Sequence, residues 1–155
     1  MQNDTKKTCC FFGHRDRVYN EPDVFVILLD KVKELIKKGY NEFLFGGYGM
    51  FDALAHKAVK SFKEGYPYLK SVYVLAYLRN NFDRDYLNNM YDEIVYPEIE
   101  EKPKRFAIAY RNKKIIDDSE VCIFYVDRSY GGAYKAMQYA KRKKKEFINI
   151  IDFKV

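Results

Sequence analysis

The chain has 155 residues, enough for one domain with a hydrophobic core and too few for two domains of ordinary size, so we expect residues 1–155 to form a single domain. Hydrophobic residues make up 48% of it, with 12 Phe and 15 Tyr, and this composition excludes a disordered chain. The net charge of +6 permits a nucleic acid, an anionic membrane surface or a phosphorylated small molecule as partner, without selecting one of them.

The cysteines and the N-terminal residues indicate the cellular compartment in which the protein is expected. Cys9, Cys10 and Cys122 cannot all pair with one another, and only two histidines accompany them in the chain, so we expect reduced core residues rather than zinc ligands. The first seven residues are polar, and no later apolar run has the length of a membrane span. We therefore expect a cytoplasmic protein with no membrane partner, no metal and no cofactor.

The chain begins with a predicted strand and a predicted helix. Thr8–Phe12 is a short apolar run stopped by Gly13, which is typical of a strand buried on both faces. Asn20 and Asp23 then resemble a capping box, and Gly39 ends the helical pattern. Between them apolar residues recur at helical spacing, at Val24, Leu28, Val32, Leu35 and Ile36.

The middle of the chain repeats this order. Glu42–Phe45 is a second short strand ended by glycines, and a second helix is marked by Phe51, Leu54, Ala55, Ala58, Val59 and Phe62. Ser71–Leu78 is a third strand by its Val, Tyr and Leu content, and Phe82–Met90 is a weaker helix. Glu93–Tyr96 is a short fourth strand, and Pro97–Lys104, with two prolines and several charges, is the longest loop.

The last third completes the alternation. Arg105–Asp118 predicts a helix and Val121–Val126 a buried strand. A final helix has a small-residue face suited to close packing, formed by Ala133, Ala136, Met137 and Ala140. Phe147–Ile151 is the final strand. Strands and helices that alternate without hairpin signals predict a doubly wound α/β fold, with a mainly parallel sheet covered on both faces.

Glycine turns follow three of these strands. They are Gly13-His14-Arg15, Gly46-Gly47-Tyr48-Gly49 and Ser129-Tyr130-Gly131-Gly132. In such a sheet ligands bind outside the carboxyl ends of the strands, where glycine lets a phosphate approach the amides of a helix N-terminus. A side chain at Gly47 or Gly132 would fill this space. The dinucleotide GxGxxG pattern and the P-loop pattern are both absent.

Four motifs lie in the chain in a characteristic order, CCFFGHR at Cys9–Arg15, FGGYGMFD at Phe45–Asp52, RNKKIIDDS at Arg111–Ser119 and GGA at Gly131–Ala133. Together they resemble the SLOG superfamily, named for its DNA-processing (DprA/Smf) and Lonely Guy members, and within it the YpsA-like branch. The resemblance covers nearly the whole chain. It implies a Rossmann-like fold, a nucleotide-type pocket built from the glycine turns, and a homodimer.

The glycine turns and the resemblance together give a predicted ligand site. Its residues are Gly13, His14, Arg15, Gly46, Gly47, Tyr48, Gly49, Asp52, Arg111, Asn112, Tyr130, Gly131 and Gly132. His14 would lie exposed at the binding edge and bond a phosphate or a base, or else pack on Tyr48. Arg15 would bind a phosphate, or else join Asp16 in a surface ion pair.

Two charged residues further along the chain have two interpretations each. Asp52 would accept a hydrogen bond from a ribose hydroxyl or act as a base, or else only complement the start of its helix. Arg111 would reach the strand ends from the middle of its helix, or else remain solvated, and Asn112 is similar. Tyr48 and Tyr130 would stack on a base as secondary site residues.

The sequence leaves two classes of small-molecule function open. The first is binding of a phosphate-bearing nucleotide, as a sensor or carrier. The alternative is a nucleotide-processing enzyme such as an N-glycosidase, with Asp52 in catalysis. Lonely Guy enzymes use the glutamate of a PGGxGTxxE motif, and Gln138 stands at that position here, which argues against the same chemistry because an amide cannot act as that carboxylate does.

A third interpretation is single-stranded nucleic-acid binding, suggested by the positive charge and by the DNA-processing members of the superfamily. The densest basic run, Lys141–Lys145, closes the last predicted helix, where cations offset the helix dipole. That helix would carry the run away from the predicted site, and aromatic residues do not interleave with it. The sequence therefore favours nucleic acid less than a small nucleotide ligand.

Overall fold

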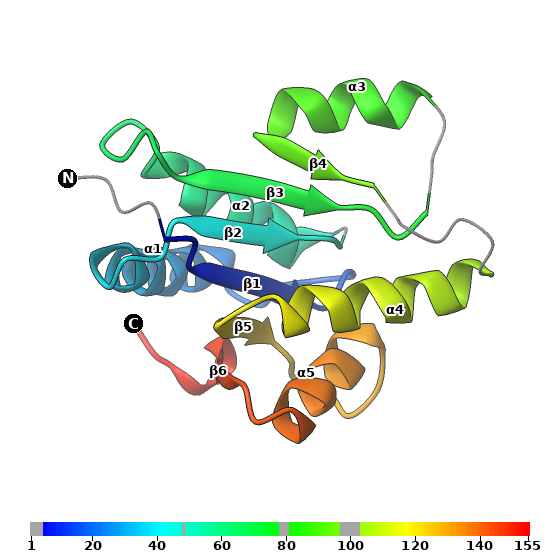
Figure 1. Ribbon diagram of the computed structural model, residues 1–155. Coiled ribbons are helices and arrows are strands. Elements are labelled where there is room, and N and C mark those ends of the chain that lie inside the picture. The colour runs from blue at the N-terminus through cyan, green and yellow to red at the C-terminus, as the bar shows by residue number, and fades with distance from the viewer. Residues whose placement is uncertain (1–4, 48, 78–80, 97–102) are drawn as a thin grey trace.

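The computed structural model describes residues 5–47, 49–77, 81–96 and 103–155. Strands and helices alternate along them (Figure 1). The strands are β1 (Thr8–Gly13), β2 (Glu42–Phe45), β3 (Lys70–Val74), β4 (Glu93–Val95), β5 (Val121–Tyr125) and β6 (Glu146–Asn149). The helices are α1 (Glu21–Lys37), α2 (Met50–Ser61), α3 (Asn81–Met90), α4 (Lys104–Asp117) and α5 (Gly132–Arg142), followed by a 3-10 turn at Ile150–Asp152.

The strands form a parallel sheet in the order β4-β3-β2-β1-β5-β6. From β1 the chain builds outward to β4, then crosses back to place β5 on the other side of β1. The order therefore reverses between β1 and β5, and their carboxyl ends form the topological switch point. This is the Rossmann-like, doubly wound architecture that the alternation of elements predicts.

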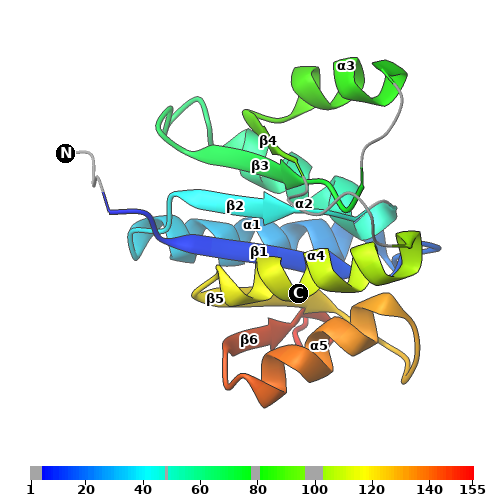
Figure 2. The ribbon, with the colours of Figure 1, turned by 45° about the vertical axis from the view of Figure 1, so that its right-hand side comes forward.

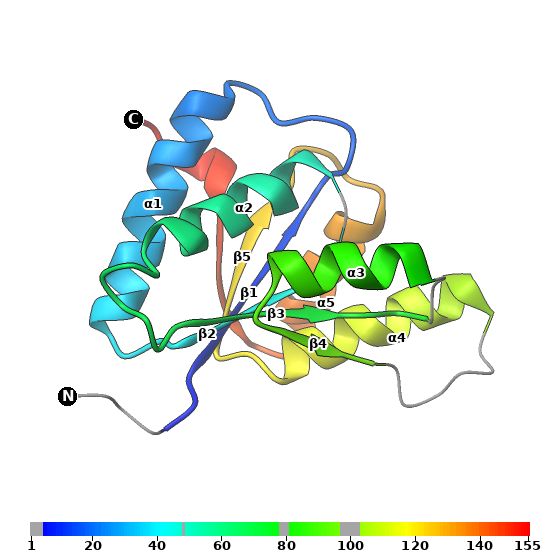
Figure 3. The ribbon, with the colours of Figure 1, turned by 90° about the horizontal axis from the view of Figure 1, so that it is seen from above.

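Each face of the sheet has its own core because successive side chains of a strand point to opposite faces. Phe11, Phe43 and Ile123 pack with α1 and α2, together with Leu87 of α3. Phe12, Leu44 and Phe124 point the other way and pack with α4 and α5. Figures 2 and 3 show α1 and α2 on one side of the sheet and α4 and α5 on the other. Burial on both faces explains why the strands are continuous apolar runs.

Several boundaries differ from the sequence predictions. The ladder of β3 stops at Val74 because its neighbour β4 ends at Val95, whose carbonyl accepts the N–H of Leu75. The predicted capping box is wrong: Asn20 is the N-cap of α1, but its side chain donates to Asp23 Oδ2 at 2.6 Å and caps no backbone N–H. The final strand gives way to the 3-10 turn at Ile150.

The remaining sequence predictions concern the cysteines, two segments that lie partly outside the described residues, and the absence of a membrane span. Cys9, Cys10 and Cys122 are buried free thiols, as expected. Most of the predicted loop Pro97–Lys104, and Leu78 of the predicted third strand, lie outside the described residues. No helix in the described ranges combines the length and the apolar character that crossing a bilayer needs.

Candidate functional site

A cavity of about 380 Å³ opens at the carboxyl ends of the strands, beside the switch point. The turns after β1 and β5, the start of α2, the end of β3 and the middle of α4 all contribute to its wall. Most of the predicted site residues line it, namely Gly13, His14, Arg15, Gly47, Asp52, Arg111, Asn112, Tyr130, Gly131 and Gly132. Gly46 and Gly49 lie behind this wall, and Tyr48 lies outside the described residues.

Three of the glycines are required by packing between elements. A Cβ at Gly13 would lie 2.5 Å from Phe51 Cβ, so glycine lets the start of α2 approach the end of β1. A Cβ at Gly46 would lie 2.8 Å from Ile115 Cδ1 of α4. Gly49 has a φ of 117°, and its Cβ would lie 2.6 Å from the Cα of Arg15. Their glycine identity therefore follows from steric contacts inside the protein.

The glycines that line the cavity differ in the space available for a side chain. A Cβ at Gly47 would lie 2.6 Å from Asp52 Oδ2, whereas a Cβ at Gly132 would meet no atom within 4 Å. Gly131, the N-cap of α5, has a φ of 95°, a conformation that L residues rarely adopt. Gly49 and Gly131 thus hold backbone conformations that favour glycine, while Gly132 borders unfilled space in the cavity wall.

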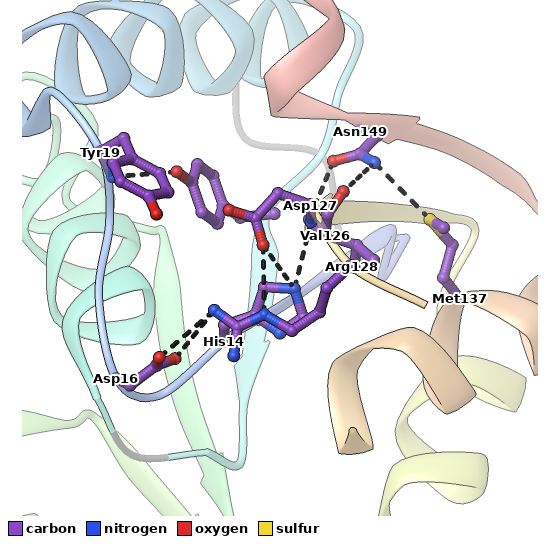
Figure 4. Close-up of polar contacts among 9 residues, drawn as sticks. His14, Asp16, Tyr19, Val126, Asp127, Arg128, Met137 and Asn149 are labelled. Carbon is purple, nitrogen blue, oxygen red and sulfur yellow. Dashed lines mark hydrogen bonds and ion pairs between the residues drawn. The ribbon is translucent and has the colours of Figure 1, made fainter. Parts of the chain in front are cut away.

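His14 is buried, not exposed as the sequence suggested, with 5% of its surface accessible. Its Nε2 accepts a hydrogen bond from the backbone N–H of Asp127 at 3.1 Å (Figure 4). Its ring is nearly perpendicular to the ring of Tyr125, at an interplanar angle of 82°. Burial lowers the pKa of His14, and the Arg128 guanidinium adds to this effect. The ring is therefore a neutral element that ties the turn after β1 to the turn after β5.

An ion pair that the sequence did not predict closes the same side. Arg128 Nη2 lies 3.2 Å from Asp16 Oδ1, and Arg128 Nε lies 3.3 Å from Asp127 Oδ1 (Figure 4). Asp16 thus pairs across the two turns rather than with its neighbour Arg15. The hydrogen bond from Arg128 holds the pKa of Asp16 below its usual range. The available signal was the position of Arg128, three residues after a buried strand at the edge where ligands bind.

Asp52 is the buried charge of the cavity. It lies in the first turn of α2 with 5% of its surface accessible, and within the described chain its Oδ1 has no hydrogen-bond partner. Burial raises the pKa of Asp52 to about 7, although the positive charges of Arg111 and Arg15 act in the opposite direction. A buried polar atom without a partner is uncommon, and this oxygen is able to accept a hydrogen bond from a ligand hydroxyl or amine.

Arg111 crosses from α4 to the strand ends, as its length suggested. One guanidinium nitrogen, Nη1, donates to the carbonyl of Gly46 after β2, and Nε donates to Asn112 Oδ1 at 3.0 Å. These bonds hold the guanidinium against the second glycine turn, at the cavity wall. Arg111 therefore joins α4 to the turn that places Asp52.

Sequence reasoning missed the remaining wall of the cavity. Its additional residues are Phe12, Asp16, Tyr73, Leu75, Ala76, Tyr77, Ile108, Arg128 and Ala133. The stretch from Tyr73 to Tyr77 runs directly out of a buried strand, which was the signal that this edge joins the site. Tyr130 stands at the rim with 67% of its surface exposed, and Arg128 Cζ lies 5.5 Å from its ring centroid. Across the described ranges, no three side chains are grouped as metal ligands would be.

Gln138 and the basic run Lys141–Lys145, on which two of the functional alternatives depended, do not line the cavity. Gln138, at the place of the Lonely Guy glutamate, lines a separate hollow between α4 and α5. Lys145 of the basic run donates to the carbonyls of Asp117 and Ser119, just before β5 begins. The end of the dense basic run is therefore directed toward the amino ends of the strands, away from the cavity.

Two solved structures with the same fold are DNA-processing proteins. DNA processing protein A (DprA) from Streptococcus pneumoniae superposes with a TM-score of 0.65 at 14% identity, over 92% of this chain and 49% of its own. DprA from Helicobacter pylori, described with a single-stranded DNA binding mode, gives 0.63 at 16% identity, over 93% of this chain and 65% of its own. The chain thus spans about half to two thirds of these proteins.

No family model and no curated protein matches the sequence. At these identities the two DprA structures show the fold, which is Rossmann-like and of the DprA type. The resemblance to the SLOG superfamily is supported at the level of the fold, and the YpsA-like branch remains a prediction.

Proposed function

We propose that this protein binds single-stranded nucleic acid and that the cavity at the strand ends holds one nucleotide unit by its phosphate. The observation that carries the proposal is that three arginines from separate parts of the fold, Arg15, Arg111 and Arg128, line one cavity. Arginine matches the geometry of a phosphate and is always charged. Backbone amides at the start of α5 add further donors at Gly132.

The residues at the rim of the cavity favour a single-stranded nucleic acid as the ligand over a free phosphate. Tyr130 is largely exposed beside Arg128, and an exposed aromatic ring next to cations is typical of surfaces on which bases stack. The described binding mode of the H. pylori DprA structure, which shares the fold, also supports single-stranded DNA above a free nucleotide. This reverses the order of preference drawn from the sequence, which relied on the position of Lys141–Lys145.

A free nucleotide is the second candidate, and Asp52 is the observation in its favour. A carboxylate at a buried position repels a phosphate but accepts from a ribose hydroxyl or a base amine. The cavity volume of about 380 Å³ also lies within the usual range of small-molecule sites. A nucleotide-processing enzyme related to the Lonely Guy enzymes, such as an N-glycosidase with Asp52 in catalysis, belongs to the same candidate.

Fluorescence anisotropy with a labelled thymidine oligonucleotide tests the proposal. Arg15→Gln should weaken binding roughly tenfold and reduce the slope of log affinity against log salt by about 0.7, because one phosphate contact with a single strand is lost. Arg17→Gln is the matched control: it removes the same charge from the same loop, but Arg17 lies over Tyr19 outside the cavity wall.

The outcomes separate the two candidates. Weak binding of the oligonucleotide together with strong thermal stabilisation by a mononucleotide would favour the second candidate, because a ligand at 100 times its Kd stabilises the folded state by about 2.7 kcal/mol. Release of free base from that mononucleotide would identify an enzyme. Equal loss of oligonucleotide affinity in Arg15→Gln and Arg17→Gln would show that the arginines act only through the net charge.

A further inference from the structure

A second hollow, of about 550 Å³, lies between α4 and α5. Its sides are formed by these two helices, which pack against each other on the same face of the sheet (Figure 2). Ile116 and Ala136 are buried beneath it. We call this hollow the α4–α5 groove.

The α4–α5 groove adjoins the cavity at the strand ends. Ile108, Asn112 and Gly132 line both. Gly132 has no side chain to separate them, and a Cβ there would meet nothing within 4 Å. From Gly132 the groove follows α5 as far as Arg142, roughly 15 Å at the rise of an α-helix. A chain leaving the cavity past Gly132 therefore enters the groove directly.

Cations from both helices line the groove. Lys113 comes from α4, Lys135 and Arg142 come from α5, and all three are exposed. Within the described part of the chain, none of the three takes part in an ion pair. Their neighbours Lys114 and Lys143 do, with Asp118 at 3.4 Å and Asp117 at 3.9 Å.

Tyr139 gathers the cations at the far end of the groove. Lys113 Nζ lies 5.6 Å from the centroid of its ring and Arg142 Cζ lies 5.7 Å from it. The Tyr139 hydroxyl donates to Asp117 Oδ1 at 2.8 Å, which fixes the ring and occupies the nearest carboxylate. The ring face attracts like-charged groups that would otherwise repel one another, and so holds them close enough to meet one polyanion.

We propose that the α4–α5 groove carries the nucleic-acid strand onward from the cavity, with Lys113, Lys135 and Arg142 binding successive phosphates. This inference rests on the proposed function and extends it from one nucleotide unit to a path of several. The charge of the groove favours a polyanion over a second copy of the chain: a two-fold contact brings the same patch of both subunits together, which would set these cations against one another.

The triple variant K113Q/K135Q/R142Q tests the groove. With a thymidine oligonucleotide of about 15 residues, it should weaken affinity 10- to 100-fold and reduce the salt slope by about 2, since each single-strand phosphate contact adds roughly 0.7 to that slope. With an oligonucleotide of about two residues, one of which the cavity holds and which is too short to follow the groove, affinity should change less than roughly twofold.

The matched control is K33Q/K37Q/K60Q, which removes the same charge from exposed lysines of α1 and α2 on the opposite face. Equal losses in the two triple variants, or equal losses for short and long oligonucleotides, would overturn the proposed path. So would a changed oligomeric state of the groove variant in light scattering, which would identify a self-interface.

The result also separates this inference from the function on which it rests. If the long oligonucleotide binds and its binding depends on Arg15 but not on the groove, only the path is wrong. If wild-type protein binds neither oligonucleotide, the proposed function itself fails.

Discussion

Asp52 is a buried carboxyl group in the wall of the cavity, and its pKa lies near neutrality. Its carboxylate faces Arg111 from α4 and Arg15 from the turn after β1, and both favour the ionised form. Burial is the stronger effect and raises its pKa to about 7, while burial also keeps the nearby Tyr73 and Tyr91 neutral by raising their pKa values. The folded protein therefore binds a proton at Asp52 in conditions where the unfolded chain does not.

This proton makes stability depend on pH. The contribution of protonated Asp52 to the free energy of unfolding is fully present below the unfolded pKa of about 3.9 and is lost as pH rises through about 7. Between these two pH values only the folded state holds the proton. We predict that Asp52→Asn will have a higher free energy of unfolding than wild type at pH 8, by about 1–3 kcal/mol. At pH 4 the two should be nearly equal. Urea denaturation across this range measures the difference.

Two carboxylates with lowered pKa values, Asp16 and Asp92, change stability with pH in the direction opposite to Asp52. Asp16 and Asp92 stabilise the folded state above their unfolded pKa values, and the same carboxylates are present in wild type and in Asp52→Asn. Subtracting the two pH profiles therefore isolates Asp52. A difference that grows toward acid instead of toward alkali would mean that the Arg111 and Arg15 charges outweigh burial.

At the scale of the elements, close approach of α2 to β1 determines the geometry of the site. α2 begins directly after the second glycine turn, and its Phe51 packs over Gly13 at the end of β1. This contact brings Asp52, the next residue, beside the turn that holds His14 and Arg15. Any atom added at Gly13 must therefore displace the helix that carries Asp52.

Replacing Gly13 should consequently be far more harmful than replacing Gly132. We predict that Gly13→Ala will lower the free energy of unfolding by about 1–3 kcal/mol, as other overpacked core positions do. Gly132→Ala, where a Cβ meets no atom within 4 Å at the first residue of a helix, should change it by less than about 1 kcal/mol. Thermal melts followed by circular dichroism compare the two, and similar losses would refute the steric explanation.

The elements themselves could be predicted from the sequence because the signals are local. Apolar runs such as Val121–Val126 and helical spacing such as Val24 to Ile36 depend only on neighbours in the chain. The end of β3 could not be predicted, since β4 sets the length of their shared ladder. The sequence correctly indicates that α1 starts after Asn20. The predicted capping hydrogen bond is wrong, because the Asn20 side chain bonds to Asp23 rather than to the backbone.

The site could be predicted in outline only. Glycine turns and the parallel sheet indicate which edge holds the cavity, because that follows from topology. The burial of His14 depends on Asp127, and the partner of Asp16 is Arg128, each more than 100 residues away in the chain. Similarly, the cations around Tyr139 come from two helices, so inspection of Lys141–Lys145 alone finds Arg142 but not Lys113. Long-range contacts of this kind leave no local pattern.

For the whole molecule, two charged regions lie at opposite ends of the parallel strands and have different surroundings. On one side the cavity gathers Arg15, Arg111 and Arg128 at the carboxyl ends of the strands. On the other, Lys143 and Lys145 contact Asp117 near the amino end of β5. The positive charge of +6 is thus distributed, and the part that lies at the strand ends has helix N-termini and unfilled space beside it.

Gly132 is the residue at which this arrangement is best tested, because it borders both the cavity and the α4–α5 groove. The Cβ of a valine there would meet no atom within 4 Å, so the fold should persist. The same side chain would occupy the volume next to the first amides of α5, where a phosphate would bind. We predict that Gly132→Val will weaken oligonucleotide binding at least tenfold in anisotropy measurements, with a melting temperature close to wild type.

Gly65→Val is the matched control for that change. Gly65 is also exposed and also has room, since its nearest contact for a Cβ is the Phe62 carbonyl oxygen at 4.0 Å, but it lies in the turn between α2 and β3, away from both hollows. It should leave binding unchanged. If Gly132→Val remains folded and binds as tightly as Gly65→Val, the phosphate does not lie at the N-terminus of α5. The site would then have to be sought away from the switch point, even though the fold places three arginines there.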